Sequence, residues 1–268
     1  MEVHAHSHTA DPDPSTGSGH RGRKKWTHYL WEFIMLFLAV FCGFLAEYQL
    51  EHMIEKQREK QLVKSLVNDL IADTLRLDAI ITARNEREWM FDSLSILLNY
   101  DPPIDSTNNI YYYAIFIPRG TSIRFTPTDG TLQQLKNSGG LRLISKRLVA
   151  DSISRYDVEI RSLLLQQEGE VAIFEAYRTI AHRFFNARIF DNMLNANNSP
   201  SPPTSNPALI SFTQNDLNEF NYKLFSVKAL NKANRRDEKR LLMQAKNLLA
   251  LLQKEYHLSE RNLQGSPL

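Results

Sequence analysis

Hydrophobic residues follow two different patterns along this chain. From Phe33 to Ala46 every residue is uncharged and apolar or small, so a helix there is hydrophobic on every side. From Val63 onward, apolar residues instead recur every three or four positions, which is typical of helices that bury one face. The pattern predicts one helix that faces lipid, followed by helices that pack against one another.

The apolar segment reaches the length of a membrane anchor when its N-terminal flank is included. Its 14 residues are short for a bilayer, but extension back to Trp26 gives 21 residues, close to the ~20 that a spanning helix needs. The flank brings Trp26, Tyr29 and Trp31 to the level of the headgroups, where aromatic side chains are common. The run ends at Glu47 without a small-x-small cleavage site, so we expect an uncleaved transmembrane helix over 26–50.

Basic residues set the expected orientation of this anchor. Four of them lie directly before it, Arg21, Arg23, Lys24 and Lys25. Positive flanks stay in the cytoplasm, so we expect a single-pass protein of the inner (cytoplasmic) membrane with a cytoplasmic N-terminus and a periplasmic C-terminal domain.

The tail over residues 1–25 has few apolar side chains and is expected to be disordered. Its histidines His4, His6 and His8 are candidate ligands for a divalent metal, because imidazole nitrogens bind such ions. The alternative is a solvated tail, since no carboxylate or cysteine completes a closed site.

One face of the anchor carries a candidate helix-association site. Helical spacing places Glu32, Ala39, Gly43 and Ala46 on this face, and Ala39 and Gly43 form a small-xxx-small pair that lets two helices approach closely. Glu32 either makes a polar contact with a partner helix or reaches the headgroup layer.

Beyond the anchor, residues 51–100 are expected to form a stalk helix that becomes the first helix of the bundle. The segment 51–61 is polar all round, and an apolar stripe then begins at Val63 and continues to Leu98. The helix must end before Pro102 and Pro103, because proline disfavours helical geometry in the preceding residue.

Residues 101–127 are expected to form an irregular connector. Within it, the β-branched and aromatic run 110–117 fits a short strand or, equally, a buried helical turn stopped by Pro118. If 110–117 is a strand, residues 123–125 would return beside it, giving a short β-hairpin near 110–125.

Residues 128–258 are expected to form the rest of an antiparallel helical bundle. Thr126 and Asp129 have the spacing of a capping box around Pro127, and Ser145 is a candidate cap for the next helix. Gly169 is a candidate interruption in that helix. A Pro-rich loop spans 196–207, and residues 259–268 are expected to be a flexible C-terminus.

The positions of proline support a fold that is mainly α. No proline lies between Pro14 and Pro102, between Pro127 and Pro200, or between Pro207 and Pro267. Proline disrupts helix interiors, so these gaps are expected of long helices.

Composition excludes several classes of function. Lys and Arg number 32 against 30 Asp and Glu, and the net charge of +2 does not favour a nucleic-acid partner. Cys42 is the single cysteine and lies in the anchor, which excludes an internal disulfide, a Cys-based zinc cluster and thiol chemistry in the exposed domain.

Two sequence stretches resemble a known family. These are W-T-H-Y-x-W-E-F-x-M-L-F-L-A-V-F-C-G-F-L-A-E-Y-Q-L-E-H at 26–52 and L-K-N-S-G-G-L-R-L-I at 135–144. Together they resemble the uncharacterised single-pass membrane proteins found chiefly in Bacteroidetes, in which an anchor helix precedes a helical extracytoplasmic region with an L-K-x-S-G-x-L-x-L-I segment. The resemblance implies a membrane location and a helical domain, and it transfers no catalytic residues.

The second stretch also contains a candidate anion-binding turn. Backbone N–H groups at Gly139 and Gly140, with the side chains of Lys136 and Arg142, have the chemistry to hold a carboxylate or phosphate. A helix C-cap that leads into a tight turn explains the same residues.

The motifs favour a binding protein over an enzyme. The chain has no G-x-S-x-G, no phosphate-binding loop and no clustered histidines beyond the tail, so we expect no catalytic residues and no cofactor. We expect a membrane-anchored helical bundle that binds a partner protein or ligand on the extracytoplasmic side. The expected partners are the lipid bilayer and either a second copy or another membrane or periplasmic protein. The alternatives are a one-pass sensor and an accessory subunit of a membrane complex.

Overall fold

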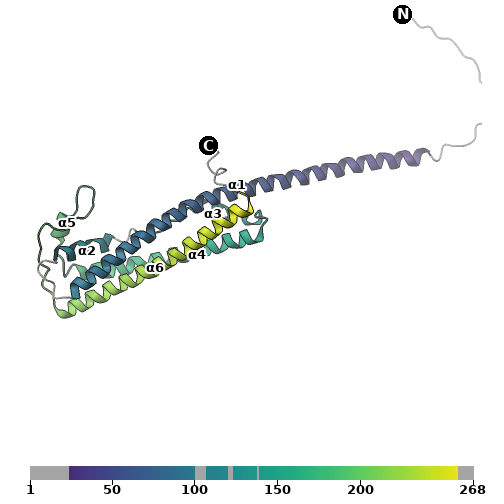
Figure 1. The fold of residues 1–268 in the computed structure, drawn as a ribbon. Coiled ribbons are helices and arrows are strands. Elements are labelled where there is room, and N and C mark those ends of the chain that lie inside the picture. Colours follow the sequence, from purple (N-terminus) through teal and green to yellow (C-terminus); the bar gives the residue numbers. More distant parts are fainter. Residues whose placement is uncertain (1–23, 100–106, 120–122, 138, 259–268) are drawn as a thin grey trace, which may run out of the picture. The chain divides into compact units, whose positions relative to one another are not determined.

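The architecture is mainly helical, as the hydrophobic pattern predicts (Figure 1). The computed structural model describes residues 24–99, 107–119, 123–137 and 139–258. Over these ranges the chain forms helices and one isolated bridge between Leu194 and Pro200, without a β-strand. Residues 1–23 of the His-bearing tail and the C-terminus 259–268 lie outside the described residues.

Three long helices and several short ones make up the described chain. In order they are α1 (Lys24–Asn99), α2 (Thr107–Arg119), α3 (Gly130–Asn137), the 3-10 turn η3 (Gly140–Arg142), α4 (Arg147–Ala181), α5 (Ala187–Met193) and α6 (Gln214–Glu255). The chain divides into two compact units, residues 1–55 and residues 56–268. The first holds the N-terminal part of α1, and the second holds the rest of α1 and all other helices.

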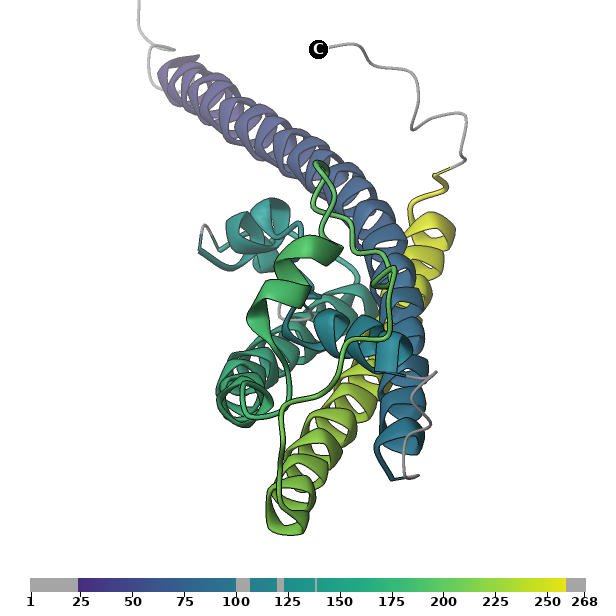
Figure 2. The ribbon, with the colours of Figure 1, turned by 90° about the vertical axis from the view of Figure 1, so that its left-hand side faces the viewer.

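Within the second unit, α6 runs antiparallel to both α1 and α4. Ion pairs along α1 and α6 join Asp92 to Lys228 and, further along, Asp78 to Lys246. The two views show α1 and α6 side by side (Figure 1 and Figure 2). Between α6 and α4, Asn234 bonds to Glu170, and Arg240, further along α6, pairs with Glu159, earlier on α4, so these two helices are antiparallel as well. The helices α1 and α4 run parallel, so the chain must cross back between them, and α2 and α3 lie on that crossover.

Two hydrophobic clusters fill the interior of this unit. One joins the middle of α1 to α3, the first half of α4 and the C-terminal half of α6, with Leu70, Leu132, Tyr156 and Leu248 among its members. The other joins the C-terminal end of α1 to α2, the second half of α4, α5 and the N-terminal half of α6. The side chains of each cluster come from elements far apart in the sequence, so each cluster forms only when the whole unit folds.

The run 110–117 belongs to a helix, so the predicted β-hairpin near 110–125 is wrong. Ile110, Tyr111, Ala114 and Ile115 are buried in the second cluster, at the spacing of one helix face. Residues 123–129 form neither a helix nor a strand, and several of their backbone groups bond to side chains of α1. For example, Ile123 O accepts from Arg84 and Thr128 N donates to Asp73 Oδ1 at 2.8 Å.

Contacts with side chains of α1 also explain why two predicted helix caps are wrong. The structure starts α3 at Gly130, because Arg76 binds Thr126 O and Asp73 binds Thr128 N, which keeps Thr126 out of a capping position. Ser145 also caps no helix. Its backbone N and its Oγ donate to Glu59 Oε1 at 2.8 and 3.0 Å, and Lys146 occupies the N-cap position of α4.

Two other local predictions have clear outcomes. Gly139 has a φ of 69°, the left-handed conformation typical of a helix C-cap, which the sequence allows as the alternative to an anion-binding turn. Gly169 does not interrupt α4, which continues through it to Ala181.

Candidate functional site

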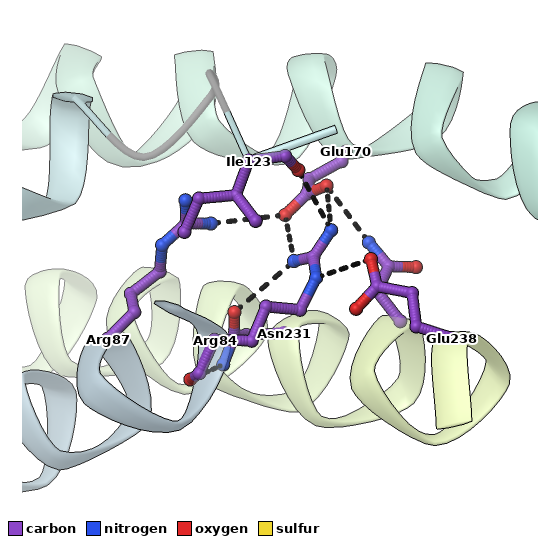
Figure 3. A network of polar contacts seen from close by, with 7 residues as sticks. Arg84, Arg87, Ile123, Glu170, Asn231 and Glu238 are labelled. Atoms are coloured by element: carbon purple, nitrogen blue, oxygen red, sulfur yellow. Dashed lines mark hydrogen bonds and ion pairs between the residues drawn. The ribbon is translucent and has the colours of Figure 1, made fainter. Parts of the chain in front are cut away.

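A buried polar layer separates the two hydrophobic clusters. On α1, Arg84 and Arg87 lie between Ile80 of the first cluster and Phe91 of the second. On α4, Glu170 follows Leu163 and precedes Phe174, and on α6 the polar positions lie between Val227 and Leu241. The side chains of this layer are Arg84, Arg87, Glu170, Asn231, Asn234 and Glu238. Figure 3 labels all of them except Asn234. Each is at most 3% exposed, so the layer is closed to water.

Arg84 is the centre of the layer. Its Nη1 and Nη2 donate to the two oxygens of Glu170 at 2.8 and 3.1 Å, and its Nε donates to Glu238 Oε1 at 2.7 Å (Figure 3). The guanidinium also donates to Asn231 Oδ1 at 3.3 Å and to Ile123 O at 3.1 Å. These five bonds match the five N–H donors of an arginine, and this is how a fully buried guanidinium is satisfied.

The two carboxylates of the layer have unequal numbers of donors. Glu170 accepts both bonds from Arg84, one from Asn234 Nδ2 at 2.9 Å and one from Arg87 Nη1 at 3.4 Å. Four donors suit an ionised carboxylate, which has about four lone-pair positions. Glu238 accepts from Arg84 alone, and its Oε2 has no hydrogen-bond partner within the described residues. The geometry therefore favours a proton on Glu238 rather than on Glu170.

The pKa shifts in the layer agree with this difference. Burial raises the pKa of Glu238 from 4.5 to about 7, and the attraction of Arg84 opposes the shift only in part. Burial, assisted by repulsion from Arg84, lowers the pKa of Arg87 to about 10. Burial also tends to lower the pKa of Arg84, but its bonds to the two carboxylates outweigh this and raise the pKa. At neutral pH both arginines are charged and Glu238 is the group that titrates.

A second buried contact lies in the first cluster. Tyr156 on α4 donates its hydroxyl to Asp73 Oδ2 on α1 at 2.8 Å, and burial together with this carboxylate raises the pKa of the tyrosine. The other oxygen of Asp73 binds Thr128 N. Thus α1 holds both α4 and the segment 123–129 before α3 through one carboxylate.

The residues of the predicted helix-association face all lie in the first unit. Glu32, Ala39, Gly43 and Ala46 are exposed, as are most of their neighbours in the apolar segment. Glu32 lies 3.8 Å from His28, one turn earlier on the same helix. A Cβ atom added at Gly43 would meet nothing within 4 Å, so this position is open.

The predicted anion-binding turn is brought together only in part. Lys136 at the end of α3 pairs with Asp157 of α4 at 3.0 Å, so its charge already has a partner. Gly140 is buried against Leu135, whereas Gly139 and Arg142 are exposed. The backbone N–H of Arg142 donates to Gly139 O at 2.9 Å within the turn.

The predicted metal ligands His4, His6 and His8 are not among the described residues. Within the part of the chain that the structure describes, no group of three or more His, Cys, Asp or Glu side chains is arranged to hold a metal ion.

The polar layer was missed in the sequence, although a signal for it was present. The apolar positions of α6 follow a repeat of seven, and two polar residues replace apolar ones in the series Leu224, Asn231, Glu238, Ala245 and Leu252. Arg84 lies seven residues after Leu77 and seven before Phe91. Polar residues at core positions of three helices predict a buried polar contact, but the sequence does not show which helices share it.

The comparisons with known proteins add no relative. No protein-family model, no curated protein and no solved structure matches this chain.

Proposed function

We propose that this protein is a membrane-anchored, non-enzymatic helical bundle that binds a partner protein or ligand on the extracytoplasmic side. One observation carries the proposal, namely that α1 contributes to two different environments. Its N-terminal part holds the one segment among the described residues that is long and apolar enough to cross a membrane, and none of that segment is buried. Its C-terminal part supplies core side chains, from Val63 to Leu98, to the folded unit.

The exposed apolar side chains of the N-terminal part of α1 support its assignment as a membrane anchor. Phe33, Phe37, Phe41 and Phe44 leave large apolar surface exposed on the helix, and Met53 and Ile54 extend it. Exposed apolar surface of this extent is unfavourable in water and is explained by contact with lipid tails. The resemblance to single-pass membrane proteins from Bacteroidetes is consistent with the same assignment.

Orientation is the part of the proposal that an experiment tests most directly. We expect residues 56–268 to lie outside the cytoplasm, because the basic cluster at 21–25 precedes the anchor. Protease added to spheroplasts should digest the bundle, and a cytoplasmic marker protein in the same sample should stay intact. Digestion only after the cells are lysed would place the bundle in the cytoplasm and contradict the proposal.

We also propose that the anchor associates with a second helix through the face of Ala39 and Gly43. Small residues allow close approach of two backbones in lipid, where packing drives association. Purification in mild detergent would show whether the partner is a second copy or an unrelated membrane protein. A monomer that carries no other protein would contradict this part of the proposal.

A one-pass sensor is the second candidate, and the polar layer is the observation that favours it. A buried carboxyl that titrates near neutral pH gives the bundle a means to respond to its surroundings. A sensor of this kind must bind its partner protein differently when the conditions around the bundle change. If partner binding in detergent is the same at pH 5 and pH 8, this alternative is wrong.

A further inference from the structure

A cavity of about 200 Å³ lies in the second unit, where α2, the end of α4 and α5 meet. Figure 1 labels α2 and α5 at the same end of the bundle. The walls of the cavity combine small and aromatic residues: Ala114 on α2, Ala181 on α4, Phe185 after it and Phe190 on α5. Phe185 and Phe190 contact each other and both contact Tyr111, with centroids 5.3 to 5.5 Å apart. These ring contacts give the cavity an ordered aromatic wall.

The size of the cavity limits what it can hold. A cavity of about 150 Å³ with apolar walls accommodates one benzene molecule, so 200 Å³ has room for one aromatic ring and one small substituent. Pockets for drug-sized molecules are larger, at ~300 Å³ or more. The alanines at three of the wall positions are the reason for the empty space, because they leave short side chains opposite the rings.

Two of the side chains that line the cavity carry basic groups. Arg178 lies in the last turn of α4 and His182 directly follows the helix, and none of the described side chains that line the cavity is acidic. Arg178 also pairs with Glu175 one turn earlier. A guanidinium has five N–H donors, so it can bind this glutamate and a second carboxylate together.

A third feature is a buried hydroxyl. Tyr177 lines the cavity and is 0% exposed, and its hydroxyl has no hydrogen-bond partner within the described residues. Burial of an unpaired hydroxyl costs free energy. The hydroxyl is closed to a bound molecule as well as to water, so it plays no part in the proposed site.

We propose that this cavity binds a small aromatic carboxylate, with the ring among Ala114, Ala181, Phe185 and Phe190 and the carboxylate at Arg178 and His182. The inference rests on the proposed binding function and names the class of its ligand. It does not depend on the orientation of the protein in the membrane, because all of the residues belong to the second unit.

The test compares three probes that share one ring. The full chain in phosphatidylcholine nanodiscs is titrated with 4-fluorobenzoate, 4-fluorotoluene and 4-fluorobenzylamine, and binding is followed by fluorine NMR. We expect saturable binding of the benzoate, binding of the toluene weaker by about tenfold because the charge-assisted bonds are lost, and no saturable binding of the amine. Equal affinity for the benzoate and the toluene, or uptake of the benzoate that does not saturate, would overturn the proposal.

Two variants with matched controls locate the site. Ala181→Leu should abolish benzoate binding by filling the cavity, and Ala172→Leu, on an exposed position of the same helix, should not. Arg178→Gln should weaken benzoate binding about tenfold and leave toluene binding unchanged, and Arg188→Gln, an exposed arginine outside the cavity, should change neither. Helix content measured by circular dichroism checks that each variant is folded. Benzoate binding by folded Ala181→Leu at the affinity of the unchanged protein would show that the ligand lies elsewhere.

Discussion

Replacement of Glu238 by glutamine tests the account of the polar layer. The pKa of this carboxyl is 4.5 in the unfolded chain and about 7 in the folded one, because burial penalises its charge. Between these values the folded state binds more protons than the unfolded state. The free energy of unfolding therefore falls as pH rises from 4.5 to 7, and the contribution of Glu238 is constant above and below this window.

The magnitude follows from the same two pKa values. Each pKa unit corresponds to about 1.4 kcal/mol, so the charge on Glu238 lowers the free energy of unfolding by about 3 kcal/mol at pH 8 relative to pH 5. Glutamine stays neutral at both values. Its amide oxygen can take the bond from Arg84 Nε, and its amide nitrogen occupies the position of the unpaired Oε2. We expect Glu238→Gln to match the unchanged protein at pH 5 and to be more stable by about 3 kcal/mol at pH 8.

The assay is urea unfolding of the full chain in detergent micelles at the two pH values. Trp89 reports on the folded unit because its ring packs against Tyr113 of α2 at a centroid distance of 5.4 Å. Replacement of Trp26 and Trp31 by phenylalanine removes the other tryptophan signals.

The matched control is Glu159→Gln, which removes a carboxylate that is 26% exposed and paired with Arg240 at 3.0 Å. Such surface pairs contribute about 0–1 kcal/mol, and the control should show no change in pH dependence. The reasoning would be refuted if the stability that Glu238→Gln gains over the unchanged protein differed by less than about 1 kcal/mol between pH 5 and pH 8, or if the variant were less stable than the unchanged protein at pH 8.

Three further predictions follow from other contacts. Arg84→Met should lower the free energy of unfolding by about 3–5 kcal/mol in the same assay, since it removes the cation that binds both buried carboxylates and leaves only Arg87 beside Glu170; a loss below about 1 kcal/mol would contradict the central role of this residue. Tyr156→Phe should cost about 2 kcal/mol by removing the bond to Asp73, and unchanged urea unfolding would argue against that bond. Gly43→Ile should abolish association of the anchor in detergent without altering the folded unit, because a Cβ at this position meets nothing within 4 Å and Gly43 belongs to the first unit. Phe41→Ile on another face is its control, and association of Gly43→Ile at the level of this control would place the interface elsewhere.

Local sequence signals succeeded where the determining contacts are themselves local. The left-handed residue after α3 follows from glycine at positions 139 and 140, since glycine has no Cβ to oppose a positive φ. The helical period of α6 follows from apolar residues that must share one face, from Leu224 to Leu252. Neither feature requires knowledge of a distant partner.

The errors occurred where a distant residue competes with a local preference. Thr126 has the sequence context of a helix cap, but Arg76, fifty positions earlier, binds its carbonyl and prevents that role. Ser145 is similarly bound by Glu59 of α1. The aromatic run 110–117 suits a strand and a helix alike, and burial of one helical face in the second cluster selects the helix.

The sequence by itself was sufficient for the helical class, the apolar segment at 26–50 and the helical periodicity of the later chain, because these depend on the spacing of side chains along one element. It was not sufficient for the partners of those side chains. Arg84, Glu170 and Glu238 are separated by 86 and 68 positions in the sequence, and only the packing of three helices brings them within hydrogen-bond distance. A charge at a core position is tolerated when its counter-charge is in place, and that condition is met in the tertiary structure alone.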